Sequence, residues 1–549
     1  MSLFDALLLD PAPFHIWIAN RTDLQRGTGT ASDPFHGGMV GGVSQFDTIM
    51  NLTQVAQANV VVHLGPGTFV TKGFTDGVAG GWQIKTAMKI LGSGIDVTVL
   101  QIDNSSVTAG KHVFAIAHAL QSGTTVDAAE VADLSIDCNC GGAAASAFGA
   151  VRLLGNHARV RRVKVKNWGT LSTSVRAFAI ACLTGDAGSS VFGVDNVGIE
   201  DCYALSPVTT LASAIATAFS VGGWDYALPA GREVEGKSPF IRNCYVDGGI
   251  TTPSVSIGTG ARTTVVALSL GWCRGGVAEG NQIYNVDVGG PYQTNKSIRD
   301  SVVRNNFMKN VAFGLLFDVG QLGVAMNSSA AQAVVASGVG TVSAGGINVT
   351  TAGLTAGDRV ALDTGIPGTY LVTSVNTGAN SFTIASSASP GTYSVTTVKR
   401  VLGVGRAIVD GNIIEMPTGS TNSIGIQIKD NQASAALPDY TNGDLIVRGN
   451  KLRLVDGVTP ASGDNAYGLE LQGAKNVQVA NNVVDLKLNV LPTTPQPLQN
   501  SRCGNASYFN DLTSSGVLIQ GYKSDAPTKK YDELATLTED AFVLAFAED

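Results

Sequence analysis

Short runs of alternating apolar and polar or small residues recur along most of the chain, and glycine usually opens or closes them. Four examples are "AFAIACL" (177–183), "VALSLGW" (266–272), "IGIQIKD" (424–430) and "YGLELQG" (467–473). Alternation with a period of two is typical of a β-strand with one buried face. The pattern predicts short strands spread over roughly residues 85 to 522.

A second recurring phrase carries an amide or a thiol at a fixed place. "VAEGNQIYN", "SVVRNNFMKN", "IVDGNIIEM", "IVRGNKLRL" and "VQVANNVVD" align on one asparagine, with a small apolar residue three positions earlier. "VGIEDCYAL" and "FIRNCYVDGG" carry cysteine there instead. The aligned column consists of Cys202, Cys244, Asn281, Asn306, Asn412, Asn450 and Asn482. All successive spacings but one are 25 to 42 residues, a period that indicates a solenoid repeat.

Two strand types that alternate at this period predict an all-β fold, the parallel β-helix. One coil cannot bury its inner face, but stacked coils enclose one continuous core. An inward amide offers both a donor and an acceptor, so asparagines stacked about 4.8 Å apart can bond one another along the coils. Cysteine fills a similar volume without needing strong partners. The bias of parallel crossovers favours the right-handed form.

The one long step in the column, between Asn306 and Asn412, indicates an insertion. Residues 327–398 contain only three charged residues and read as short strands with Gly/Asn turns, which predicts a small all-β module. The predicted organisation is an N-terminal segment with a capping helix and first strands (1–84), a β-helix (85–326), the inserted module (327–400), the continued β-helix (401–522) and a C-terminal capping segment (523–549).

Both ends of a β-helix expose unpaired strand edges, so lids are expected there. Ser44, followed three residues later by Asp47, forms a capping-box pattern for a short helix. At the other end, Leu534, Leu537, Ala541 and Leu544 have the spacing of one helical face.

A column of charges lies two residues before the amide column: Glu200, Arg242, Glu279, Arg304, Asp410 and Arg448. Because the signs alternate, outward-facing side chains on adjacent coils would form ion pairs. A catalytic carboxylate in this column is the alternative interpretation.

Composition narrows the function classes. The net charge is −7 and no basic run stands out, so nucleic acid is not an expected partner. No apolar stretch reaches membrane-spanning length, and the N-terminus lacks the basic region of a cleavable leader. The seven cysteines are expected to be reduced, and the six histidines show no metal-binding spacing. We therefore expect no membrane partner, no metal and no cofactor.

The sequence resembles the pectate-lyase-like, right-handed parallel β-helix superfamily, most of all phage tailspike and tail-fibre proteins. The resemblance rests on "GTGTASDPF" (27–35), on "VVVHLGPGTFVT" (60–71), which is similar to the start of the family's first coil, and on the repeats. It extends over about residues 20 to 520. The resemblance implies a virion or extracellular surface location, a polysaccharide partner and a homotrimer.

The catalytic motifs of this superfamily are absent. The Asn-Thr-Asp, Gly-His-Gly and Arg-Ile-Lys phrases of polygalacturonases do not occur, and the calcium-binding aspartates of pectate lyases cannot be placed. Asp318, Lys429 and Glu470 lie on the second strand type, where neighbouring coils could bring two carboxyl groups within the roughly 5 to 10 Å that glycoside hydrolysis requires. Such pairs also arise by chance, so the catalytic residues stay unassigned.

Aromatic residues are the better candidates for a binding site. Trp224 and Trp272 occupy matching positions of consecutive repeats, next to Asp225 and the loop that holds Tyr292, and Trp168 is a third member. Flat rings beside polar groups suit the faces of sugars. The alternative is a packing ladder or an interface between chains.

Three functions fit these observations. The first is a virion tailspike or fibre protein that binds a cell-surface polysaccharide, with or without cleaving it. The second is a structural surface or filament-forming protein without catalysis. The third is a free polysaccharide lyase or glycoside hydrolase, which the absent motifs disfavour.

Overall fold

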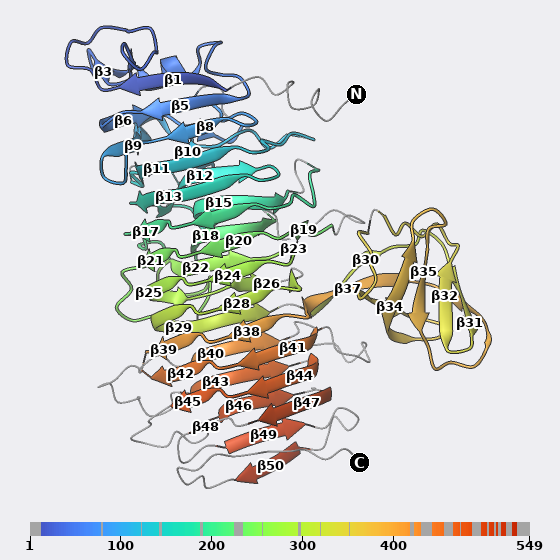
Figure 1. Ribbon diagram of the computed structural model, residues 1–549. Helices are drawn as coiled ribbons and strands as arrows, with labels where there is room; N and C mark the ends of the chain where they lie inside the picture. The colour runs from blue at the N-terminus through green and yellow to red at the C-terminus, as the bar shows by residue number, and fades with distance from the viewer. Residues whose placement is uncertain are drawn as a thin grey trace.

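The computed structural model describes the chain except for residues 1–12, 78–80, 122, 142–144, 187–189, 224–233, 255, 295–297, 319, 351, 418–421, 430–441, 455–464, 473, 486–495, 502–503, 510–511, 514–517, 523–529 and 535–549. The described residues form a long stack of short, mostly parallel strands with very little helix (Figure 1). The prediction of an all-β parallel β-helix is confirmed.

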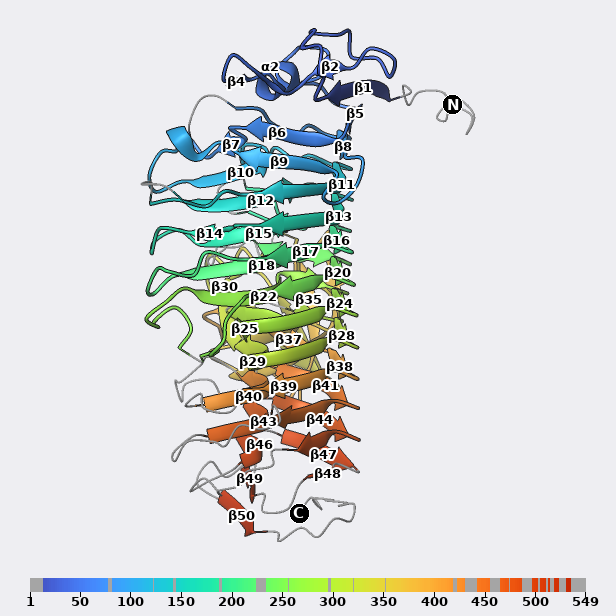
Figure 2. The same cartoon turned by 90° about the vertical axis from the view of Figure 1, so that its left-hand side faces the viewer.

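Three stacks of parallel strands form the walls, seen from the side in Figure 2. The first contains β13 (Arg159–Lys166), β16 (Gly198–Glu200), β20 (Phe240–Arg242), β24 (Val277–Glu279), β28 (Val302–Arg304), β38 (Ile408–Asp410), β41 (Asn442–Arg448) and β44 (Ala474–Ala480). The second contains β17 (Tyr203–Leu205), β21 (Tyr245–Asp247), β25 (Gln282–Val288), β29 (Phe307–Asp318), β39 (Ile413–Met416), β42 (Lys451–Leu454) and β45 (Val483–Asp485). The third contains β12 (Ala147–Leu154), β15 (Ala177–Gly185), β18 (Ile215–Gly223), β22 (Thr264–Leu270), β40 (Asn422–Lys429) and β43 (Asn465–Gln472).

The amide column lies at the bend between the first and second stacks, and its members are buried. Asn281 donates from Nδ2 to Oδ1 of Asn306 at 2.8 Å, and the same bond recurs from Asn306 to Asn412, Asn412 to Asn450 and Asn450 to Asn482 at 2.8–2.9 Å. Each Oδ1 also accepts the backbone N–H of the preceding column residue, at 3.0–3.1 Å. Cys244 joins the column through its backbone N–H, which donates to Oδ1 of Asn281 at 2.9 Å. The asparagine amides and the backbone of adjacent coils thus satisfy one another's buried polar groups.

The charges two residues before this column stand opposite one another on adjacent strands, because the register is parallel and unbroken. Glu279 contacts Arg304 at 2.7 Å and Arg242 at 3.8 Å, and Arg448 contacts Asp410 at 3.1 Å. These side chains are part-exposed or exposed, as in ordinary cross-strand pairs.

The chain between β29 and β38 leaves the β-helix and forms an antiparallel module, which projects from one side of the stack (Figure 1). Its strands are β30 (Gly320–Ala325), β31 (Ala331–Ala336), β32 (Val339–Ser343), β33 (Arg359–Leu362), β34 (Gly368–Asn376), β35 (Ser381–Ala385) and β36 (Gly391–Val395). A hydrophobic core of its own runs from Met326 to Val398. The returning strand β37 (Val398–Gly405) pairs antiparallel with β30 and β33, and then parallel with β27 (Ile298–Arg299) of the β-helix. A single strand therefore belongs to both units.

The N-terminal helix forms, but its expected capping box does not. Helix α2 (Phe46–Met50) begins after Gln45, which makes no side-chain capping bond. The Asp47 carboxylate instead accepts the Thr71 hydroxyl and, at 2.8 Å, the backbone N–H of Lys72. The carboxylate holds the turn after β6 (Gly67–Thr71), so it is not available to cap its own helix.

The prediction of a C-terminal helix is wrong at Leu534, the first residue of its expected apolar face. Leu534 lies in the strand β50 (Lys530–Leu534), antiparallel to β49 (Leu518–Tyr522). By pairing with β49, β50 bonds the backbone N–H and C=O groups that β49 would otherwise expose at the edge of the sheet. Leu537, Ala541 and Leu544 lie outside the described residues.

Candidate functional site

Four aromatic side chains lie in a row on the outside of the second stack: Tyr203, Tyr245, Tyr284 and Phe307, which we call the aromatic row. Tyr203, Tyr245 and Phe307 directly follow the column residues Cys202, Cys244 and Asn306. Successive side chains of a strand point to opposite faces, so a buried column residue places the next residue outside. Figure 1 shows β17, β21 and β25 stacked on the side of the β-helix away from the module.

The rings of this row are in contact from coil to coil. Ring centroids are 6.1 Å apart from Tyr203 to Tyr245, 5.3 Å from Tyr245 to Tyr284 and 5.8 Å from Tyr284 to Phe307. Tyr203 is 41% exposed, and the other three rings are half-buried. Contacts between rings on adjacent strands stabilise a sheet, and the part of each ring that faces solvent offers an apolar surface to a ligand.

Polar groups follow the edge of the aromatic row. Asn310 donates to Asn285 at 3.0 Å, and Asn285 donates to Asp247 at 3.1 Å, so these residues form a second polar ladder on successive coils. Partial burial raises the pKa of Tyr245, and the carboxylate of Asp247 raises it further, so the phenol keeps its proton. Ring faces can cover the apolar face of a sugar while amide, phenol and carboxylate groups bond its hydroxyls.

The aromatic residues expected from the sequence do not form this surface. Trp168 is fully buried in the core, Trp272 is 3% exposed and Tyr292 is 7% exposed. Tyr292 packs in a small cluster with Val266 and Phe313, with the Arg176 guanidinium 5.4 Å from its ring. These three rings are therefore buried within the protein. Trp224 and Asp225 lie outside the described residues.

The signal for the aromatic row was present in the sequence. Tyrosine follows the cysteine in both "EDCYAL" and "RNCYVD", and phenylalanine follows the asparagine in "RNNFMK". The position after the ladder residue identifies an outward side chain once the ladder is known to be buried. None of the predicted residues Trp168, Trp224, Trp272 and Tyr292 occupies this position.

The two carboxylate candidates, Asp318 at the end of β29 and Glu470 on β43, are out of register with one another. Asp318 stands opposite Lys429, whereas Glu470 stands opposite Gln427, two residues earlier on the same strand. Among the described residues, no group of three or more His, Cys, Asp or Glu side chains is arranged to hold a metal ion. The same part of the chain contains no helix with the length and hydropathy of a membrane-spanning segment.

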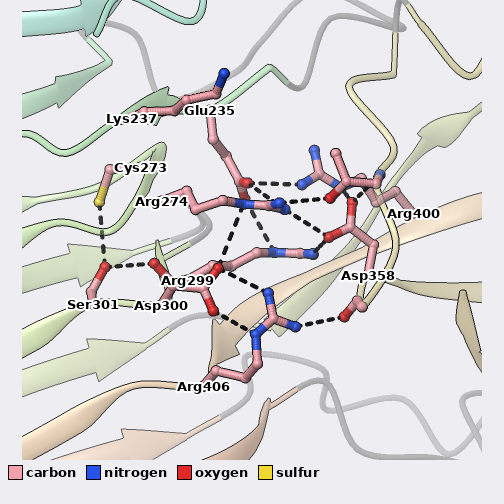
Figure 3. Close-up of polar contacts among 12 residues, drawn as sticks. Glu235, Lys237, Cys273, Arg274, Arg299, Asp300, Ser301, Asp358, Arg400 and Arg406 are labelled. Carbon is pink, nitrogen blue, oxygen red and sulfur yellow. Dashed lines mark hydrogen bonds and ion pairs between the residues drawn. The ribbon is translucent and has the colours of Figure 1, made fainter. Parts of the chain in front are cut away.

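A second polar constellation joins the module to the β-helix (Figure 3). We call it the ionic cluster: Glu235, Arg274, Arg299, Asp300, Asp358, Arg400 and Arg406. Glu235 contacts Arg274 at 3.5 Å, Arg299 at 3.1 Å and Arg400 at 3.0 Å. Asp358 comes from the module and contacts the same three arginines, Arg274 at 2.8 Å and Arg400 at 3.3 Å.

Most of the ionic cluster is closed to solvent. Asp358 and Arg400 are 0% exposed, and Glu235 and Arg299 are nearly so. Burial by itself would raise the pKa of Asp358, but the guanidinium groups of Arg299, Arg400 and Arg274 together hold it below its ordinary value. The carboxylates of the ionic cluster contact arginines, and most of its side chains are buried. The cluster therefore anchors the antiparallel module to the β-helix and does not form an open catalytic site.

Comparison with known proteins gives a likeness in fold. No protein-family description matches the sequence, and no curated protein matches it. Among solved structures, the chain is similar to PfbA, a surface adhesin of Streptococcus pneumoniae, with 10% identity over 85% of this chain and 83% of that chain and a TM-score of 0.39. It is also similar to a family 28 exopolygalacturonase of Yersinia enterocolitica, with 9% identity over 82% and 72% of the two chains and a TM-score of 0.35. Tailspike protein 3 of bacteriophage CBA120 has 8% identity over 84% and 54%, with a TM-score of 0.31. At such identities the similarity concerns the fold alone.

Proposed function

We propose that the protein binds a cell-surface polysaccharide along the aromatic row, as a tailspike- or fibre-like component of a virion. The observation that carries the binding proposal is the contact of four exposed or half-buried rings on successive coils, with a polar ladder beside them. The virion role rests on the resemblance of the repeats to tailspike proteins.

The geometry of the row suits a chain ligand better than a small molecule. The rings lie on an open wall whose coils repeat every 4.7–4.9 Å or so. An open surface covers a ligand less fully than a pocket, so each sugar contributes little affinity. A polysaccharide that contacts several rings at once gains by effective concentration, and a trimer would multiply that gain.

Substitution of one ring tests the proposal. The full-length protein is titrated with a panel of purified surface polysaccharides, and the best binder is repeated with Tyr245→Ala. We expect a loss of about tenfold in affinity, or about 1.4 kcal/mol, because the central ring contacts both neighbours and its removal divides the strip. Phe14→Ala removes a ring that is 49% exposed at the far end of the β-helix and serves as the matched control.

The outcomes separate the competing functions. Equal affinity of Tyr245→Ala and wild type would place the glycan elsewhere, and no binding across a broad panel would favour the structural surface or filament protein. New reducing ends or unsaturated products in the same incubations would identify a hydrolase or a lyase. Sedimentation equilibrium measures the oligomeric state, and the tailspike proposal expects a trimer.

A further inference from the structure

All the histidines of the chain lie near its N-terminus, at His15, His36, His63, His112, His118 and His157. Histidine is the side chain whose ordinary pKa, about 6.5, places its change of charge between about pH 5 and 8. A change of pH in that range therefore acts mainly on the coils at the N-terminal end, the blue end of the stack in Figure 2.

His15 and His63 form a pair on the outer face of the first coil. β1 (Phe14–Ala19) runs parallel to β5 (Val60–Leu64), with Trp17 opposite His63. Nδ1 of His15 lies 2.9 Å from Nε2 of His63, and the centroids of the Trp17 and His63 rings are 4.7 Å apart. A hydrogen bond between two imidazole nitrogens requires that one of them carry no proton, since two N–H groups would otherwise face each other.

The next strand supplies no counter-charge for this pair. β8 (Lys89–Leu91) places the apolar Leu91 opposite His63. Lys89, on the same strand, is paired with Glu130 at 3.2 Å. Burial and then the neighbouring His15 lower the pKa of His63. A second proton on the pair therefore meets a like charge.

His118 is a second histidine whose surroundings favour the neutral ring. It lies two residues after the end of β10 (His112–Ile116), and its side chain is 2% exposed. Among the described residues, neither of its ring nitrogens has a hydrogen-bond partner. A buried polar group without a partner is costly, and a buried charge without one is costlier still.

The charges around His118 oppose its protonation. Arg152 and Lys85 are positive, and the negative group is Asp76. The Asp76 carboxylate already accepts two bonds from the Arg152 guanidinium, at 2.7 and 2.8 Å, and lies 3.6 Å from Nδ1 of His112. Burial and then Arg152 lower the pKa of His118 to about 3, so the ring stays neutral in the folded protein.

We propose that the N-terminal end of the β-helix is an acid-sensitive switch, in which protonation of His63 and His118 opens the first coils while the later coils stay closed. Terminal coils open at the lowest cost, because they pack against a neighbour on one side only. The opened end exposes core side chains such as Ile16 and Val62, which are buried in the closed state. The switch is independent of polysaccharide binding.

The sign of the effect follows from which state binds more protons. Both His63 and His118 have a lower pKa in the folded protein than the value of about 6.5 expected for the opened chain. The opened state therefore takes up more protons in mild acid. The stability that these two neutral rings contribute is complete above about pH 6.5 and is lost as the pH falls below that value.

Hydrogen exchange of the full-length protein tests the switch. Exchange is followed by mass spectrometry at about pH 7.5 and about pH 5.5 and is corrected for the intrinsic exchange rate at each pH. We expect the protection of β10 to fall about tenfold, because pH 5.5 lies about one unit below the pKa of an opened histidine. Protection of β1 and β5 should fall as well, while that of β18 and β22 stays constant. Constant protection of β1, β5 and β10, or an equal fall in β18 and β22, would overturn the proposal.

Variants that cannot take up a proton locate the effect. His63→Gln keeps a side chain that can bond His15, and His118→Phe fills the buried site with another ring. The double variant should lose the response to acid, whereas His157→Gln, which removes an exposed histidine, should respond like the wild type. An undiminished response in the double variant would contradict the switch. If His118→Phe does not fold, His63→Gln alone decides, since an unchanged acid response of β1 and β5 there also contradicts it.

Discussion

The amide column and the ionic cluster both bury polar groups, but they satisfy them in different ways. In the column, each asparagine bonds an identical amide and the backbone of the neighbouring coil, so no charged side chain is needed. In the ionic cluster, Glu235, Arg299, Asp358 and Arg400 come from four separate stretches of chain. The column can therefore lengthen by repetition, whereas the cluster exists only when the module has docked.

This difference predicts how each region fails. A neutral ladder that loses one member leaves neighbouring polar groups without a hydrogen bond, but it leaves no buried charge unpaired. An ionic cluster that loses one carboxylate keeps buried cations without a counter-charge, which costs more.

Asp358→Asn removes one of two carboxylates that hold three arginines, and we expect a loss of about 3–5 kcal/mol in stability, as for other buried ion pairs broken on one side. The loss should appear as faster hydrogen exchange in β31–β36, with little change in β15 and β18. Equal acceleration in both regions would show that the anchor is not confined to the module. An unchanged exchange pattern would show that Asp358 is dispensable.

Asn412→Ala interrupts the column at its centre. The backbone N–H of Asn306 and the carbonyl of Val303 each lose a partner, and we expect a total loss of about 2 kcal/mol, the lower end of the range for two neutral buried groups. Chemical denaturation measures the loss. Asn412→Cys is the matched variant, because cysteine already occupies this column at residues 202 and 244, and it should lose less. A cysteine variant as unstable as the alanine variant would contradict the equivalence of the two residue types.

Acid should weaken the ionic cluster before the amide column, because the cluster contains carboxylates that take up protons and the asparagine amides do not. The pKa of Asp358 is lower in the folded protein than the value of about 3.9 expected when unfolded. Its contribution to stability is therefore complete above that value and is lost as the pH falls through the lower folded pKa. Hydrogen exchange in the module should stay slow at pH 5 and rise only in stronger acid, while the amide column stays protected. Loosening of the module already near pH 5 would contradict this assignment.

Glu279→Gln tests the exposed charge column and should have the smallest effect. The pair with Arg304 is part-exposed, and water and salt screen such pairs. Denaturation midpoints of the variant and the wild type should agree closely at physiological salt. A loss as large as that of Asn412→Ala would mean that the column contributes to stability far beyond ordinary surface pairs.

Sequence reasoning succeeded where the chemistry repeats and failed where it does not. The spacing of Asn281, Asn306 and Asn412 predicts a shared column because every coil must pass the same bend. The low charge of residues 327–398 likewise indicates a separate unit, since a unit with its own core need not share the repeat. In contrast, the spacing of Ser44 and Asp47 predicts a capping box that does not form. The Asp47 carboxylate binds Thr71 and Lys72, about two dozen residues away, and local spacing does not reveal such partners.

The candidate site also combines features that the repeat predicts with features that depend on tertiary contacts. Matching positions of Trp224 and Trp272 indicated a common corner, but the burial of Trp272 and Trp168 depends on how the chain turns after each strand. The aromatic row would have followed from the ladder by one further step, because Tyr203 and Tyr245 directly follow column residues. The ionic cluster carried no sequence signal, since Glu235 and Asp358 lie in unrelated phrases.

The amino-acid sequence by itself determined the parallel β-helix and the ladder residues, because a repeat imposes the same local environment on every coil. Only the tertiary structure decided which rings face solvent, which carboxylates meet which arginines, and where the module is anchored. Those outcomes depend on contacts between segments as far apart as Glu235 and Arg400, more than 150 residues along the chain, and no local pattern of polarity encodes such a distance.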